Sequence, residues 1–99
     1  MNDYEIFEAM KLDKEQYLLT KDKSKIQRNA TMLAKRHCDN NDNPFEQNTP
    51  GYDVFYDFIY FYNKWPKYRT TCEFKTMFLK RAIRLCDFDN PYQKEDSDE

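Results

Sequence analysis

The chain has 99 residues, of which 39% are hydrophobic, 17% aromatic and 34% charged, and its formal net charge is -2. This length allows one domain with a single core, and the many Phe and Tyr residues supply the apolar area that such a core needs. The composition excludes a glycine-rich nucleotide-binding loop, because there is one glycine, and a transmembrane helix, because there is no long apolar run.

The first twenty residues predict two short helices. Asn2 or Asp3 is suited to cap the first of them. Asp13 and Gln16 have the spacing of a capping box, in which two side chains three residues apart satisfy backbone N–H groups at a helix start. They therefore indicate a second helix that ends near Leu19.

The segment 24–38 is the clearest helix in the sequence. Ser24 and Gln27 have capping-box spacing, and the apolar positions recur with the period of a helix. One narrow arc of this helix is apolar and comprises Ile26, Ala30, Leu33 and His37. The opposite arc comprises Lys25, Arg28, Asn29, Met32, Lys35 and Arg36, of which all but Met32 are basic or polar. A polar loop over 39–51, with two prolines, is expected to follow, with Phe45 packed back onto the core.

More than half of the residues in the segment 51–65 are aromatic. We favour a helix over 52–65, because the segment is longer than a typical strand. A helix also gathers the apolar side chains on one face and aligns Tyr52, Tyr56 and Tyr60 beside it. A helix-turn-helix domain with a short β element at this segment is the alternative fold.

A last helix is predicted from the capping-box pair Thr70 and Glu73 to about Asp87. Its buried side is expected to comprise Phe74, Met77, Phe78, Ala82 and Leu85. Its exposed side is expected to comprise Thr76, Lys80 and Arg84. The sequence therefore predicts an all-α domain over residues 1–88, a compact bundle of four to five helices, and an acidic disordered tail over 89–99.

No combination of residues in the sequence indicates catalysis or a cofactor. His37 and Cys38 are adjacent, and neighbouring side chains on a helix diverge by about 100°. A zinc site built from His37, Cys38, Cys72 and Cys86 would lack the short paired spacings of structural zinc sites. We therefore expect a protein without enzymatic activity, metal or cofactor. The three widely spaced cysteines and the acidic N-terminal segment indicate a cytoplasmic protein with no membrane association.

Charge is segregated along the chain. Residues 11–37 carry eight bases and three acids, and residues 64–84 carry seven bases and one acid, whereas the remaining segments are acidic. A basic groove between the two segments, together with the helix-turn-helix rhythm of 13–37, supports a DNA-binding regulator as the second hypothesis. Its candidate contact residues are Lys25, Arg28, Asn29, Lys35, Arg36, Lys80 and Arg84. A pI near 5.4 opposes affinity for DNA.

The leading hypothesis is a small interaction protein that binds a macromolecular partner and occludes or recruits it, such as an inhibitor or accessory factor of a phage or mobile element. Tyr, Trp and Arg carry much of the binding energy at protein interfaces. The predicted contact residues are Tyr52, Tyr56, Tyr60, Trp65, Tyr68 and Arg69. The expected partner is a protein, for example one that itself binds nucleic acid, and the sequence leaves a homodimer open.

Overall fold

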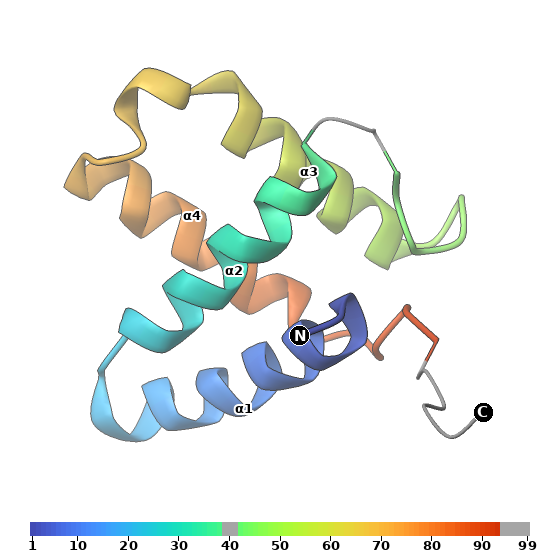
Figure 1. Cartoon of the computed structure of the whole chain (residues 1–99), viewed down its shortest axis with the longest axis horizontal. Helices are drawn as coiled ribbons and strands as arrows, with labels where there is room; N and C mark the ends of the chain where they lie inside the picture. The colour runs from blue at the N-terminus through green and yellow to red at the C-terminus, as the bar shows by residue number, and fades with distance from the viewer. Residues whose placement is uncertain (39–41, 94–99) are drawn as a thin grey trace.

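The computed structural model describes residues 1–38 and 42–93, and this part of the chain contains four α-helices and no strand (Figure 1). The helices are α1 (Asp3–Thr20), α2 (Ser24–His37), α3 (Pro50–Lys64) and α4 (Cys72–Leu85), with a short 3-10 helix, η1 (Pro66–Tyr68), between the last two. The predicted all-α bundle is confirmed. The alternative with a β element at 52–65 is wrong, because these residues lie in α3 and the turn after it.

The first twenty residues form one helix, not the two that we predicted. Asn2 caps α1 in a complete capping box: its side chain accepts a hydrogen bond from the Glu5 N–H at 2.8 Å, and the Glu5 carboxylate accepts one from the Asn2 N–H at 2.9 Å. Asp13 caps nothing, because its carboxylate accepts a hydrogen bond from the Asn29 side chain of α2 at 2.7 Å. The helix ends at Lys21, which is left-handed with φ of 65°.

The starts of α2 and α4 also differ from the predicted caps. Ser24 lies inside α2, and both its N–H and its hydroxyl donate to the Asp22 carboxylate, at 3.0 and 2.8 Å. In α4 the cap is Thr71, whose hydroxyl accepts a hydrogen bond from the Phe74 N–H at 3.1 Å, and the predicted cap Thr70 lies one residue too early. The capping patterns in the sequence thus located both helices but named the wrong N-cap residue in each, because α2 follows Lys23 and α4 follows Thr71.

α2 lies at the centre of the bundle and contacts the other three helices (Figure 1). Ala30 and Ala34 are fully buried on it, and small side chains at these positions allow neighbouring helices to approach closely. The core between α3 and α4 is aromatic: Phe58 stacks on Phe78 and Phe61 stacks on Phe74, both with ring centroids 4.9 Å apart. Burial of one such ring contributes about 1.5–3 kcal/mol to folding. The bundle therefore depends strongly on its phenylalanines.

One predicted core residue is not in the core. Met77 was placed on the buried side of α4, but 45% of its side chain is exposed. The apolar arc of α4 is wider than the surface that α2 and α3 cover, so its edge at Met77 faces solvent beside α3. Phe45 behaves as predicted and packs against the core, with its ring centroid 6.0 Å from that of Phe55.

The segment after α4 is held against the first helix. The Asn90 side chain donates to the Tyr4 carbonyl at 3.0 Å and to the Glu8 carboxylate at 2.9 Å. Tyr92 packs onto the core, with its ring centroid 6.2 Å from that of Phe7. Asn90 and Tyr92 of the predicted tail thus contact α1 and the core, and residues 94–99 lie outside the described part. Of the loop predicted over 39–51, residues 42–49 are described, and its predicted end is wrong because α3 already begins at Pro50.

Candidate functional site

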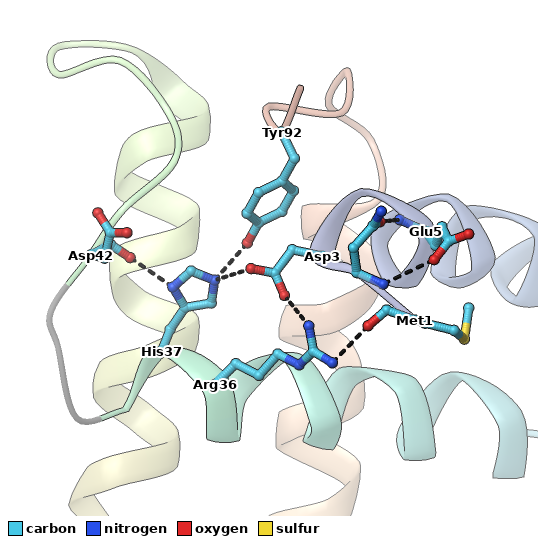
Figure 2. Close-up of polar contacts among 8 residues, drawn as sticks. Met1, Asp3, Glu5, Arg36, His37, Asp42 and Tyr92 are labelled. Carbon is cyan, nitrogen blue, oxygen red and sulfur yellow. Dashed lines mark hydrogen bonds and ion pairs between the residues drawn. The ribbon is translucent and has the colours of Figure 1, made fainter. Parts of the chain in front are cut away.

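His37, the one histidine of the chain, is a core residue at the end of α2 (Figure 2). Its Nδ1 lies 2.9 Å from the backbone carbonyl oxygen of Asp42, which assigns the ring proton to Nδ1. Its Nε2 lies 2.8 Å from the Tyr92 hydroxyl, which donates to it, and 3.7 Å from a carboxylate oxygen of Asp3. Burial raises the pKa of the Tyr92 hydroxyl well above its usual value, so this group stays protonated. The imidazole thus joins α2 to the loop and the tail.

The other candidate catalytic or metal-binding groups do not gather around His37. Cys86 is buried, which raises the pKa of its thiol to about 12, whereas Cys72 is exposed at the start of α4. Asp57 pairs with Arg81, whose Nε lies 2.8 Å from a carboxylate oxygen. Within residues 1–38 and 42–93 there is no group of three or more His, Cys, Asp or Glu side chains that is arranged to hold a metal ion.

A row of exposed rings lies along α3, the residue after it and η1, and we call it the aromatic ridge: Tyr56, Tyr60, Trp65 and Tyr68. Tyr56 and Tyr60 stack with ring centroids 6.3 Å apart. The Lys64 ammonium then lies 5.6 Å from the centre of the Tyr60 ring and 5.5 Å from that of Trp65, so it bridges the two rings. The Trp65 and Tyr68 centroids are 5.9 Å apart. These contacts make the row continuous.

An apolar hollow lies beside the ridge, between η1 and α4. It has a volume of about 290 Å³, and its walls are formed by Phe61, Trp65, Tyr68, Thr71, Glu73, Phe74 and Met77. Trp65, Tyr68 and Met77 are 40%, 55% and 45% exposed, so their side chains form the rim. Sequence analysis missed Met77 as a surface residue, because its position on α4 is indistinguishable from a core position without the packing of α3.

The structure separates Arg69 from the other predicted contact residues and places Tyr52 beside two of them. Tyr52 is half-buried and borders a different groove, of about 420 Å³, which it shares with Tyr56 and Tyr60. Arg69 lies on the far side of α3: its guanidinium covers the Tyr62 ring at 3.8 Å, and its Nε donates to the Tyr62 carbonyl at 3.1 Å. Tyr52 therefore adjoins the ridge, and Arg69 belongs to another surface.

The residues predicted for nucleic-acid binding are dispersed. Arg28 and Lys35 border one cleft between α2 and α4. Asn29 is bound by Asp13, and Arg36 donates to the Asp3 carboxylate at 2.8 Å and to the Met1 carbonyl at 2.7 Å, which Figure 2 shows. The remaining three are exposed but are not among the residues that line the cleft: Lys25, Lys80 and Arg84.

Two general observations complete the description. None of the helices in the described residues combines the length and apolar composition that crossing a bilayer requires. The chain matches no protein-family model, no curated protein and no solved structure.

Proposed function

We propose that the protein is a small non-enzymatic interaction module that binds another protein at the aromatic ridge and thereby occludes or recruits it. The observation that supports this proposal is the continuity of exposed apolar surface from Tyr56 to Met77. The side chains of the ridge are 61%, 53%, 40% and 55% exposed, in chain order. Contiguous exposed apolar patches on otherwise polar proteins mark interaction sites, and Tyr and Trp are enriched among the residues that dominate binding.

The ridge is organised before a partner arrives. Tyr56 and Tyr60 stand on α3, whose opposite face carries the buried Phe55 and Phe58 and is therefore fixed by the core. The stacking of the two tyrosines and the position of Lys64 between rings restrict the side-chain rotamers further. A surface that is already ordered loses less conformational entropy on binding, so more of its contact energy contributes to affinity.

The hollow defines the chemistry of the partner. Its walls are apolar apart from Thr71 and Glu73, and they accept one large aliphatic or aromatic side chain. The Lys64 ammonium over the Trp65 ring favours a carboxylate at that end. The partner is therefore a protein segment with an apolar anchor residue next to an acidic one. A second copy of this chain is the competing occupant, because it could supply both groups itself. The exposed carboxylate of Asp53 in α3 lies next to the N-terminal end of the ridge.

Selection from a display library of random peptides tests the proposal. The library is panned against the wild type, against the ridge variant Tyr60→Ala/Tyr68→Ala, and against the control variant Leu12→Ala/Leu19→Ala, which removes even more exposed apolar side chains from α1. We expect peptides with an apolar residue next to Asp or Glu to be enriched on the wild type and the control only. Equal enrichment on all three proteins would overturn the proposal. If the wild type and the control dimerise as their concentration rises and the ridge variant does not, the occupant of the ridge is a second copy of this chain.

A further inference from the structure

The cleft between α2 and α4 combines a basic rim with an apolar floor. It has a volume of about 450 Å³, and four of its lining residues are bases: Arg28, Lys35, Arg69 and Lys75. None of the lining residues in the described part of the chain is acidic. The floor is formed mainly by Met32, Phe74 and Phe78. Sequence analysis anticipated a groove between the two basic segments but assigned Arg69 to the ridge and did not single out Lys75.

The positive charge of this rim is not neutralised within the described residues. The ion pairs found there use Lys14, Arg36, His37 and Arg81 as their basic partners, and none of the four cleft bases. Arg69 is also fixed in place, because Tyr62 contacts both the face of its guanidinium and its Nε. Only the two terminal nitrogens of Arg69 remain for a ligand, which suits a fork-like contact with a carboxylate.

We propose that this cleft is a second docking site, and that its occupant is an amphipathic acidic helix of a partner protein. Arg28 and Lys35 are seven residues apart on α2, which places them about 10 Å apart along the helix axis. Carboxylates two turns apart on a docked helix have the same spacing. The apolar residues between those carboxylates would cover the floor, as in other helix-in-groove complexes.

The floor distinguishes a peptide from a nucleic acid. Single-stranded nucleic acids bind basic grooves by stacking their bases on open aromatic faces. In this cleft Arg69 covers the Tyr62 ring, Phe74 stacks on Phe61, and Phe78 stacks on Phe58. Tyr62, Phe74 and Phe78 are only 2%, 6% and 3% exposed. No ring face is open for a base, whereas aliphatic side chains pack well on such ring edges. The net charge of -2 also disfavours a long polyanion.

The cleft and the ridge are separate surfaces on either side of Phe74, which lines both the cleft and the hollow. Their variants are therefore chosen from residues that line only one of them. Arg28→Glu/Lys35→Glu reverses two charges in the cleft, and Lys80→Glu/Arg84→Glu reverses two exposed charges outside it on α4. Both pairs change the net charge equally, so a difference between them reports position and not total charge.

Fluorescence anisotropy with designed probes tests this inference. The probes are a labelled helical peptide with Leu on one face and Glu beside it, the same peptide with Gln in place of Glu, and a single-stranded oligonucleotide. We expect the Glu peptide to bind the wild type and the Lys80→Glu/Arg84→Glu control, to bind the cleft variant at least about tenfold more weakly, and to bind more weakly as salt rises. The Gln peptide should bind weakly to all of them.

Three results would overturn the proposal: no binding of the Glu peptide to the wild type, equal weakening in the cleft variant and the control, or tighter binding of the oligonucleotide that the cleft variant loses. Arg28→Gln/Lys35→Gln, with matching circular dichroism melts, guards against an effect of misfolding. Tyr60→Ala/Tyr68→Ala should leave peptide binding unchanged. This comparison keeps a failure of the cleft proposal distinct from a failure of the proposed function.

Discussion

Tyr56 and Tyr60 stack on the outer side of α3 with their ring planes only 11° apart, although more than half of each side chain is exposed. The spacing of four residues places one ring above the other on a helix. Because the other face of α3 is buried, the helix cannot rotate to hide these rings. The stacked pair therefore presents a fixed apolar surface to solvent, and this surface is the basis of the first prediction.

Tyr60→Ala should weaken binding of a peptide selected on the ridge by about 30-fold, the equivalent of about 2 kcal/mol, which is typical of a residue that dominates an interface. The change removes one ring of the stack and one of the two rings that hold Lys64. Isothermal titration calorimetry measures the effect. Leu19→Ala removes an even more exposed side chain from α1 and should leave the affinity unchanged. Equal losses in both variants would contradict the assignment of the ridge.

Tyr92→Phe should destabilise the fold by about 1–2 kcal/mol, because it leaves the buried Nε2 of His37 without its hydroxyl donor. Urea unfolding followed by circular dichroism measures this change. Tyr68→Phe is the matched control, since it removes the hydroxyl of an exposed tyrosine and should have no measurable effect. Identical unfolding midpoints for both variants would show that residues 89–93 do not contribute to stability through this contact.

Gly51→Ala should destabilise the protein by about 1–3 kcal/mol, although alanine is the better helix former. A Cβ at this position would lie 2.5 Å from Cδ1 of the Phe45 ring, which packs on the core. A double-mutant cycle with Phe45→Leu should show coupling, because the smaller side chain leaves room for the added methyl group. Additive effects of the two changes would mean that the ring is not fixed over Gly51.

Stability should fall in alkaline solution through Cys86. Burial raises the pKa of this thiol from its usual 9.0 to about 12, so above pH 9 the unfolded chain releases a proton that the folded chain retains. The contribution is complete below pH 9 and is lost progressively between pH 9 and 12. Urea titrations at pH 8 and above pH 9 should therefore show a smaller loss for Cys86→Ala than for the wild type. Parallel losses in both proteins would contradict the assignment.

The same burial predicts selective thiol chemistry. Cys72 is exposed at the start of α4 and should react with iodoacetamide in the folded protein at neutral pH, whereas Cys86 should react only after unfolding. Mass spectrometry of peptides from the labelled protein locates the modified residues. Rapid labelling of Cys86 under native conditions would show that the end of α4 opens readily.

The periodicity of apolar residues in the sequence was sufficient to predict that α2, α3 and α4 are helices, because each carries an apolar stripe with a helical period. The boundary inside the first twenty residues was misplaced for a physical reason. Asp13 has the side chain of a capping residue, but a tertiary hydrogen bond from Asn29 on α2 occupies it. A pattern that spans a few residues contains no information about a partner sixteen residues away.

The same distinction applies to the surfaces. Tyr56, Tyr60, Trp65 and Tyr68 were predicted together, since their relation depends on one helix and the turn that follows it. The cleft depends on how α2 packs against α4, so the pairing of Arg28 and Lys35 with Arg69 and Lys75 became visible only in three dimensions. Met77 became a surface residue for the same reason.

Trp65 is the one tryptophan of the chain and stands in the middle of the ridge, so its emission reports directly on occupation of the proposed site. The most direct test is acrylamide quenching of Trp65 fluorescence before and after addition of a peptide selected on the wild type. We predict a shift of the emission to shorter wavelength and a clear loss of quenching, because the bound peptide covers a side chain that is 40% exposed in the free protein. Unchanged emission and unchanged quenching, at a peptide concentration that saturates binding, would contradict the assignment of the ridge as the docking surface.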